Sequence, residues 1–485
     1  MTESNAAGAL APAPRQVHLS RDAHALPQSR YYEIPMATAS AESSRTSLPT
    51  LASKHDAGID YELFLDCVHC GLCTSACPTY VELGDENDSP RGRIYLMRAV
   101  TDRRIDLDAS VQKHLDLCLD CRACESACPS GVQYGKLIEP FRIHMQKIGA
   151  NHDNLSWLQK IMLHNVTPYT GRLRLALAPA RFLQWTGMDR MMRKLGVYRL
   201  MPRSLREMHD MLPPLRAHYG SMPEVLPADT PRRARVALFT GCAADAFFPQ
   251  TNLATALALQ KNGCDVWIPR KQVCCGALHY HAALDQPAKQ FAQQNCDAFL
   301  PSAPGMAGVG VDAIIVNAAG CGAMLKDYGH LFHHSPLEEK AARFAKKVKD
   351  VSEFLMELGP VKPTHPIELK ATYHDACHLC HGQQIRKQPR QLLELIPDLQ
   401  VAPLNESEIC CGAAGSYNLT QPEMAERLGE RKARKVFETN ADAVFSGNVG
   451  CLIQLGRYLR AKKPEIVIAH PIDALWASYC GAKIA

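Results

Sequence analysis

The chain has 485 residues, of which 46% are hydrophobic and 21% are charged, and its formal net charge is +5. A chain of this length favours about two to four domains, and so small a net charge leads us to expect no nucleic-acid partner. No apolar run is long enough to predict a membrane-spanning helix.

Cysteine is unusually frequent, with 20 residues in the chain, and no secretory signal precedes them. In a reducing compartment, cysteines in such numbers serve as metal or redox ligands rather than as disulfides. We therefore expect a cytoplasmic protein whose cysteines bind metal.

Residues 1–55 are rich in Ala, Ser and Pro and lack apolar periodicity, which predicts a disordered extension. A cleaved transit peptide is the alternative, because the segment contains several arginines. Acidic residues balance those arginines, so the pattern favours the extension.

Residues 56–150 contain two cysteine runs, Cys67-x2-Cys70-x2-Cys73-x3-Cys77-Pro78 and Cys118-x2-Cys121-x2-Cys124-x3-Cys128-Pro129. In a two-cluster ferredoxin, three cysteines of a run bind one [4Fe-4S] cluster and the fourth binds the other cluster. We therefore predict two [4Fe-4S] clusters. One is expected to bind Cys67, Cys70, Cys73 and Cys128, and the other Cys118, Cys121, Cys124 and Cys77.

Structural zinc is the alternative for these eight cysteines, but zinc sites usually combine two Cys-x2-Cys pairs. Here four cysteines lie within eleven residues, and they do so twice. Forty residues separate the two runs, and their apolar spacing predicts helices over 94–100 and 111–115. The pattern therefore predicts a helical domain with two clusters.

Three arginines flank the cluster runs, namely Arg91, Arg93 and Arg122. Positive charge near the cluster sulfurs should raise the reduction potential. Ordinary surface salt bridges are the alternative.

Residues 151–230 form a basic, helical connector. Between Gly171 and Arg216, ten Lys or Arg residues face three acidic residues, a net charge of +7. Such a stretch is typical of a helix on an anionic membrane surface or of a site for an acidic partner subunit. A connector with a solvated basic face is the third interpretation.

Residues 231–485 contain an internal repeat. Its first copy, lobe 1 (231–360), contains Cys242, Cys274, Cys275 and Cys321, and its second copy, lobe 2 (361–485), contains Cys377, Cys410, Cys411 and Cys451. Each copy includes one Cys-Cys-Gly triplet. From Cys242, Cys274 and Cys321 to their counterparts in the second copy the distances along the chain are 135, 136 and 130 residues. The cysteines of the two copies therefore have nearly the same spacing.

Short β-rich runs precede these cysteines at 235–240, 313–317, 371–374 and 443–446, with helical patterns at 252–260 and 422–437. This alternation predicts two α/β lobes with parallel sheets. The fold class we expect is thus α+β multidomain, with a helical ferredoxin domain before two Cys-Cys-Gly lobes. Since ligands collect beyond the carboxyl ends of parallel strands, most of the repeat cysteines should meet there.

Three interpretations of the repeat cysteines stay open: a further iron–sulfur cluster in each repeat or in one of them, a redox-active disulfide site, or packed and inert thiols. His374, His378 and His381 surround Cys377 and are candidate nitrogen ligands or proton carriers.

The first cluster run continues through Pro90-Arg-Gly-Arg-Ile-Tyr-Leu96, and two Cys-Cys-Gly repeats follow. Together these motifs closely resemble the iron–sulfur subunit of bacterial glycolate oxidase over residues 56–485. The iron–sulfur subunits of glycerol-3-phosphate dehydrogenase and the Cys-Cys-Gly subunit of heterodisulfide reductase are similar at a greater distance. The latter pattern closes with Cys-x2-Cys, whereas Ala318 and Asn448 stand at the first position of that pair here.

The resemblance implies a complex in which glycolate is oxidised to glyoxylate at FAD on partner subunits. This chain would relay the electrons toward quinone or another membrane acceptor, with the complex held peripherally on the cytoplasmic membrane. The sequence contains no Gly-x-Gly-x-x-Gly turn and no Walker loop, which fits a flavin on the partner. A glycerol-3-phosphate or lactate dehydrogenase subunit, and a non-catalytic metal-binding assembly protein, are the alternatives.

Overall fold

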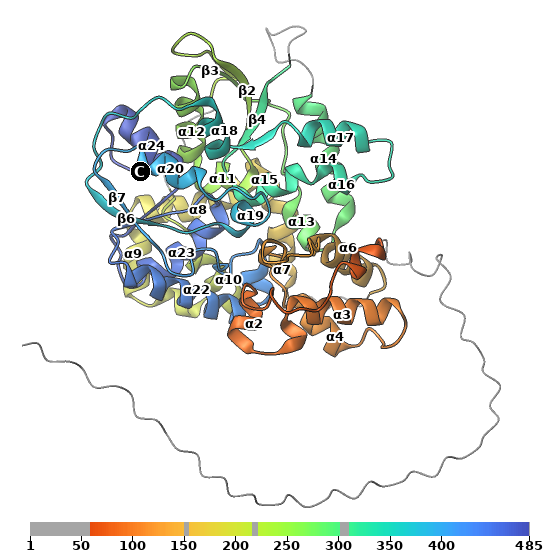
Figure 1. The fold of residues 1–485 in the computed structure, drawn as a ribbon. Coiled ribbons are helices and arrows are strands. Elements are labelled where there is room, and N and C mark those ends of the chain that lie inside the picture. Colours follow the sequence, from red (N-terminus) through yellow and green to blue (C-terminus); the bar gives the residue numbers. More distant parts are fainter. Residues whose placement is uncertain (1–58, 150–154, 216–221, 301–309, 485) are drawn as a thin grey trace, which may run out of the picture. The chain divides into compact units, whose positions relative to one another are not determined.

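The computed structural model describes residues 59–149, 155–215, 222–300 and 310–484 (Figure 1). The extension predicted for residues 1–55 lies outside this part of the chain. Within the described residues, no helix has both the length and the apolar character needed to cross a bilayer.

Residues 59–149 fold into helices without any strand. The elements are α1 (Glu62–Leu65), α2 (Pro78–Leu83), η2 (Glu86–Asp88), α3 (Pro90–Thr101), α4 (Ala109–Asp116), α5 (Ala123–Ser126) and α6 (Gly135–Lys147). Apolar side chains from α1, α3, α4 and α6 form the core, among them Phe64, Met97, Leu115 and Phe141. Both cysteine runs leave this core through loops, so the packed helices position the thiols.

Helix starts in this domain follow from side-chain caps. Ser89 Oγ accepts a hydrogen bond from the Gly92 N–H at 3.0 Å, and Pro90 occupies the first position of α3. Asp108 caps α4 in the same way, accepting from the Val111 N–H at 2.9 Å. These caps fix the helices that separate the two cysteine runs.

The connector is also helical. Its elements are α7 (Trp157–Ile161), the π-helical turn η3 (Met162–Val166), α8 (Thr170–Trp185), α9 (Met188–Lys194), η4 (Val197–Leu200) and α10 (Arg203–Asp210). Helix α8 buries Leu173 and Leu177 beside Ala246 of lobe 1, and Arg174 pairs with Asp245 at 2.6 Å. The connector is therefore packed against the first lobe along one face of α8.

Lobe 1 is a five-stranded sheet in the order β1-β3-β2-β4-β5, in which only β1 runs antiparallel to its neighbour. Its strands are β1 (Val225–Leu226), β2 (Ala234–Phe239), β3 (Cys264–Trp267), β4 (Ala313–Val316) and β5 (Val348–Asp350). Its helices are α11 (Cys242–Phe247), α12 (Pro249–Lys261), α13 (Ala277–His281), α14 (Asp285–Phe299), α15 (Ala319–Lys326), α16 (Tyr328–Leu331), α17 (Glu338–Ala345) and α18 (Val351–Leu358).

Lobe 2 is a parallel four-stranded sheet in the order β7-β6-β8-β9. Its strands are β6 (Leu369–Tyr373), β7 (Leu399–Ala402), β8 (Ala443–Phe445) and β9 (Val467–Ala469). Its helices are α19 (Cys377–Cys380), α20 (Gln388–Glu394), α21 (Tyr417–Thr420), α22 (Pro422–Glu438), α23 (Val449–Arg460) and α24 (Pro471–Cys480). This strand order matches β3-β2-β4-β5 of lobe 1, so the internal repeat is a repeat of fold.

The two lobes pack on each other through equivalent helices. Helix α12 packs on α24, and its counterpart α20 packs on α18, the counterpart of α24. Reciprocal pairs of this kind indicate an approximate two-fold relation between the lobes. One apolar core runs from Val236 and Ile315 of lobe 1 to Tyr373 and Phe445 of lobe 2.

The predicted fold class is confirmed: a helical ferredoxin domain precedes two α/β lobes. The four predicted strand runs coincide with β2, β4, β6 and β8, and the predicted helices coincide with α3, α4, α12 and α22. The sequence did not predict β1, β3, β5, β7 and β9, several of which carry a charged residue among their apolar ones, such as Asp265 in β3 and Lys349 in β5.

Candidate iron–sulfur centres and the contacts between them

The first set of cysteines lies in the loop between α1 and α2, with one member from the second run. Cys67, Cys70 and Cys73 share a small cavity with Cys128, beside Arg91. Burial raises the pKa of the Cys73 thiol to about 11. The pKa of Cys67 is raised by burial and by its neighbour Cys128. The thiols of the two runs thus cross, as they do in a two-cluster ferredoxin.

The second set is more deeply buried. Cys118, Cys121 and Cys124 share another cavity with Cys77, which caps α2 at its N-terminus. Burial raises the pKa of Cys124 well above its usual value, with Cys121, Cys118 and Cys77 as further causes. The structure therefore brings together the two four-thiol sets that the spacing predicts. Soft thiolates in groups of four suit iron in tetrahedral sulfur sites, so both sets fit the implied clusters.

The backbone takes the same course around both sets. His69 and Gly71 in the first loop have positive φ angles of 53° and 84°, and Asp120 and Arg122 at the equivalent positions have φ angles of 50° and 60°. Left-handed residues on either side of a cysteine turn the chain around a bound group. Glycine adopts this conformation without strain, whereas Arg122 does not.

The Arg122 side chain is part of a buried charge network. Its guanidinium lies 3.0 Å from Asp120 and 3.0 Å from Glu139 of α6. The same two carboxylates each lie 3.4 Å from Nδ1 of His281, which ends α13 in lobe 1. The network therefore ties the second cysteine loop to lobe 1.

The network shifts the pKa values of its members. Burial disfavours charged His281, but the nearby carboxylates of Asp120 and Glu139 outweigh it and raise the pKa of the imidazole to about 9. Burial raises the pKa of Glu139 to about 7, although Arg122 opposes that shift. Burial also opposes ionisation of Asp120, yet Arg122 and His281 hold its pKa well below the usual range. Sequence reasoning missed His281 and Glu139, because no local pattern connects positions so far apart.

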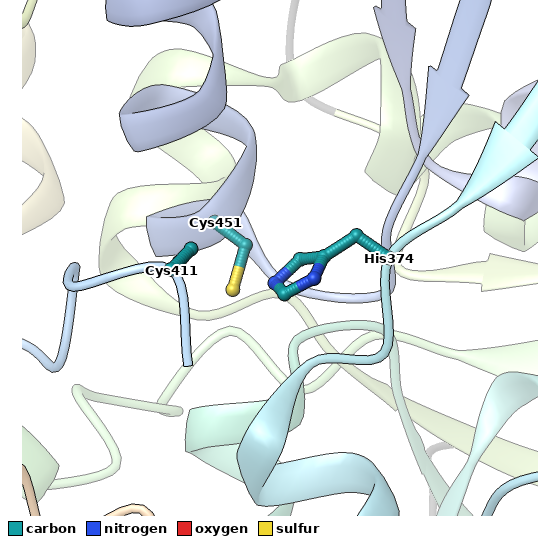
Figure 2. A group of neighbouring side chains, drawn as sticks. All are labelled: His374, Cys411 and Cys451. Carbon is teal, nitrogen blue, oxygen red and sulfur yellow. The ribbon is translucent and has the colours of Figure 1, made fainter. Parts of the chain in front are cut away.

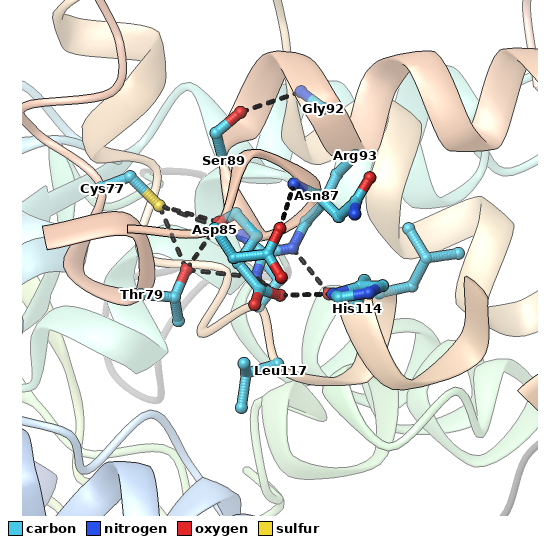
Figure 3. Close-up of polar contacts among 12 residues, drawn as sticks. Cys77, Thr79, Asp85, Asn87, Ser89, Gly92, Arg93, His114 and Leu117 are labelled. Carbon is cyan, nitrogen blue, oxygen red and sulfur yellow. Dashed lines mark hydrogen bonds and ion pairs between the residues drawn. The ribbon is translucent and has the colours of Figure 1, made fainter. Parts of the chain in front are cut away.

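Arg93 forms a second buried contact, beside Cys77 of the same cysteine set (Figure 3). Its guanidinium is 1% exposed and donates hydrogen bonds to Asp88 at 3.2 Å and Thr79 at 3.1 Å. Nη1 lies 3.9 Å from Sγ of Cys77. His114 Nδ1 lies 2.9 Å from the same Asp88 carboxylate. This places a fixed positive charge beside a predicted cluster ligand.

The three flanking arginines were predicted either to raise the reduction potential of a cluster or to form ordinary surface salt bridges, and they differ in this respect. Arg93 is buried beside the second cysteine set, and Arg122 lies there with 13% of its side chain exposed. Arg91 instead forms a partly exposed salt bridge with Glu86 at 2.6 Å. The surface salt bridge considered above therefore applies to Arg91 alone.

The lobe 1 cysteines follow the carboxyl ends of three neighbouring strands. Cys242 begins α11 after β2, the Cys274–Cys275 pair follows β3, and Cys321 lies in α15 after β4. The Sγ atoms of Cys242 and Cys274 are 3.5 Å apart. Cys275 contacts both Cys274 and Cys321 through its thiol.

The lobe 2 cysteines repeat this arrangement. Cys377 begins α19 after β6, the Cys410–Cys411 pair follows β7, and Cys451 lies in α23 after β8. The Sγ atoms of Cys377 and Cys410 are 3.9 Å apart, and Cys411 contacts Cys410 and Cys451. All four thiols are buried. The structure therefore brings together four candidate thiols in each lobe.

The glycine of each triplet lets a helix approach the thiols. Gly412 has a φ of +85°, and a Cβ there would lie 2.8 Å from the carbonyl oxygen of Ala425 in α22. Gly276 has a φ of +89°, and its Cβ would lie 3.2 Å from the Ala288 oxygen in α14. A side chain at either position would push away the helix that covers the paired cysteines.

The second ferredoxin-type cysteine set lies against lobe 2. Cys121 packs in one buried cluster with Cys377 and Cys410, together with Met424 and Leu428 of α22. Polar contacts surround this cluster: Tyr417 donates to the Leu117 carbonyl at 2.8 Å, and His381 lies 3.0 Å from Ser126 Oγ. The thiols of the ferredoxin domain and of lobe 2 thus share one buried interface.

Comparison with known proteins gives a consistent result. A 4Fe-4S dicluster domain matches residues 64–132, a glycolate oxidase iron-sulfur subunit linker region matches 154–212, and a cysteine-rich domain matches twice, at 236–326 and 371–456. The linker match covers the basic connector, which is therefore a recurring element and not an irregular insertion.

Two relatives cover most of the chain. The probable glycolate oxidase iron-sulfur subunit of Bacillus subtilis is 40% identical over 399 residues, which is 81% of this chain and 88% of the relative. The glycolate oxidase iron-sulfur subunit of Escherichia coli is 32% identical over 407 residues, 80% of this chain and 89% of the relative. Lactate utilization protein A of Shouchella clausii is 30% identical over 242 residues, only 50% of this chain but 98% of the relative. The chain therefore belongs to the family of glycolate oxidase iron–sulfur subunits.

Proposed function

We propose that this chain is the electron-transfer subunit of a flavin-dependent glycolate oxidase complex, in which glycolate is oxidised to glyoxylate at FAD on partner subunits. The single observation that carries the proposal is similarity along most of the chain, connector included, to proteins named glycolate oxidase iron-sulfur subunit. The two groups of four crossed thiols support it independently, because they suit carriers of single electrons.

The proposed ligands of the two [4Fe-4S] clusters are the two crossed sets, and bound clusters would accept and release one electron at a time. The remaining work belongs to this chain's own residues. The helical core holds the thiols in place, and Arg93 and Arg122 supply positive charge at the second set. The Arg93 charge, 3.9 Å from Sγ of Cys77, favours the reduced form of the cluster at this set.

The proposed acceptor is a quinone, which takes up two electrons and two protons to become a quinol. Support comes from a cavity of about 300 Å³ next to Cys118, lined also by Asp120, His281, His378 and Tyr417. Such side chains can pass protons to a bound acceptor. A quinone in a cavity beside a cluster ligand is close enough to that cluster to accept electrons from it one at a time.

Peripheral association with the cytoplasmic membrane is supported by the exposed face of the connector. Helix α8 buries Leu173 and Leu177, while Leu175, Phe182 and Trp185 are 76%, 55% and 80% exposed. Apolar side chains beside basic ones are typical of a helix that lies on an anionic bilayer.

The double substitution Leu175→Glu with Trp185→Glu tests this association. We expect the complex to dissociate from vesicles of anionic lipid at physiological salt, because two negative charges replace apolar side chains that would enter the bilayer. Co-sedimentation with the vesicles measures the effect, and Leu173 and the rest of the lobe contact stay untouched as an internal control of folding. If the variant complex stays bound to the vesicles, the exposed face docks a partner subunit instead.

The substitution Cys70→Ala tests the relay itself. Loss of one ligand from the first set should remove one cluster and reduce glycolate-dependent dye reduction by the purified complex more than about 100-fold. The substitution Cys480→Ala, at an exposed cysteine outside every proposed set, is the matched control. Full turnover by Cys70→Ala would contradict the relay.

A further inference from the structure

The two lobes share the order of four strands and a set of four cysteines, but a residue at the base of the site differs between them. Lobe 2 has His374 directly after β6. At the same repeat offset of 135 residues, lobe 1 has Phe239, the last residue of β2. A nitrogen ligand is therefore available in lobe 2 and is replaced by an aromatic ring in lobe 1.

His374 is oriented as a metal ligand. Its Nδ1 lies 3.0 Å from the carbonyl oxygen of Ser407, so Nδ1 carries the proton and donates it. The Nε2 lone pair is then free, and this atom is buried without a hydrogen-bond partner among the described residues. A backbone acceptor on one ring nitrogen is the usual support for a metal on the other.

The free nitrogen faces thiols. One ligand atom each of His374, Cys411 and Cys451 lie within 4.8 Å of one another, all buried (Figure 2). The other two histidines near Cys377 are used differently. His381 contacts Ser126 and the Glu408 carbonyl, and His378 lies with Nδ1 3.5 Å from Cys377 Sγ.

The number of ligands points to more than one metal ion. Two thiolates on one tetrahedral metal lie about 3.8 Å apart, which agrees with the 3.9 Å between Cys377 and Cys410. His374, Cys411 and Cys451 form a second group beside that pair. Five donors exceed the four that a single tetrahedral zinc ion takes. They suit an iron–sulfur cluster, which distributes its ligands over several irons.

The position of the site favours the same conclusion. Cys377 and Cys410 lie in one buried cluster with Cys121, a proposed ligand of the second ferredoxin-type set. In lobe 1, by contrast, Cys242, Cys274 and Cys275 pack in a separate apolar cluster that contains no ferredoxin-type cysteine. Among the described residues, the lobe 1 thiols also form no group of three ligand atoms as compact as the one in lobe 2.

We propose that lobe 2, and not lobe 1, binds a third iron–sulfur cluster, with His374 as a nitrogen ligand beside Cys377, Cys410, Cys411 and Cys451. Metal binding follows from the residues of this lobe. Only its place as the next carrier after the second ferredoxin-type set rests on the proposed function.

The first test is composition and spectroscopy of the anaerobically purified full chain. Iron and acid-labile sulfide should exceed the about eight atoms of each that two [4Fe-4S] clusters contain. In protein labelled with ¹⁵N-histidine, pulsed EPR of the dithionite-reduced protein should show a directly bonded nitrogen. About eight irons with no such coupling, or zinc in lobe 2, would overturn the proposal while leaving the two-cluster relay intact.

Matched variants of the two lobes give the second test. Cys451→Ser should lose the iron above about eight, whereas Cys321→Ser, at the equivalent position of lobe 1, should keep it. His374→Phe, which installs the lobe 1 residue, should abolish the nitrogen coupling, and His378→Phe should not. Retention of the ferredoxin-type EPR signals shows that each variant is folded. A nitrogen coupling that survives His374→Phe would refute the assignment of this ligand, and equal iron loss from both serine variants would refute the difference between the lobes.

Discussion

Lobe 1 and lobe 2 share a strand order, a cysteine frame and a two-fold packing, yet they meet the ferredoxin domain in different ways. Lobe 1 contacts it through charges, with His281 between Asp120 and Glu139. Lobe 2 adds a contact of thiols and apolar side chains, with Cys377 and Cys410 against Cys121, to a salt bridge between Arg431 and Glu82 at 2.8 Å. The comparison teaches that a repeated motif determines a fold and a set of thiols, whereas the residues around that motif decide what the thiols do.

The charged contact of lobe 1 offers the largest stability effect. His281→Gln leaves two buried carboxylates with only Arg122, and losing one partner of a buried ionic group should lower the free energy of unfolding by about 3 kcal/mol. Denaturant unfolding measures this value. The control is His333→Gln, because His333 pairs with Glu338 on the surface, where a salt bridge contributes under about 1 kcal/mol.

The stability difference between the parent chain and His281→Gln should depend on pH. The pKa of His281 is about 9 in the folded chain and near 6.5 when unfolded. Its stabilising contribution is therefore complete below pH 6.5 and is lost as the pH rises through 9. The stability difference between the parent chain and His281→Gln should shrink over that range. A difference that is constant from pH 6 to pH 10 would show that His281 is not the charged member of the network.

The glycines of the two triplets allow a smaller and more direct comparison. Both have positive φ angles, but a Cβ on Gly412 meets a backbone oxygen at 2.8 Å and one on Gly276 does so at 3.2 Å. We expect Gly412→Ala to cost about 1 kcal/mol more than Gly276→Ala, on top of the about 1–2 kcal/mol of a left-handed alanine. Gly84→Ala, with positive φ and open space, measures that conformational cost alone. Equal losses in all three variants would contradict the tighter packing of lobe 2.

Much of this molecule could be predicted from its cysteine spacing. The interval of three residues inside each run and the proline after it predicted two crossed thiol sets, and the repeat frame predicted two equivalent lobes. The strands in the centre of each sheet could be predicted because they are continuous apolar runs, such as 235–240. The outer strands could not, since pairing with a neighbour stabilises them more than their own residues do.

The contacts between domains could not be predicted, because they join residues without a common local pattern. Glu139 and His281 lie on different domains, and only folding brings both beside Asp120. His374 was one of three candidate histidines near Cys377, and its place beside Cys411 and Cys451, with Nδ1 bonded to Ser407, distinguishes it from the other two. The repeat offset alone shows that lobe 1 has Phe239 where lobe 2 has His374. Only the structure shows that this position lies beside the thiols.

The central claim is that this chain carries electrons from glycolate oxidation, and one titration tests it most directly. Glycolate is added without oxygen to the assembled complex, and EPR follows the reduced clusters of this chain. The account predicts that glycolate produces the same ferredoxin-type signals as dithionite, and that the Cys70→Ala complex loses the signal of the first cluster. Signals that appear with dithionite but never with glycolate would contradict the account, because the clusters would then lie outside the path from substrate to acceptor.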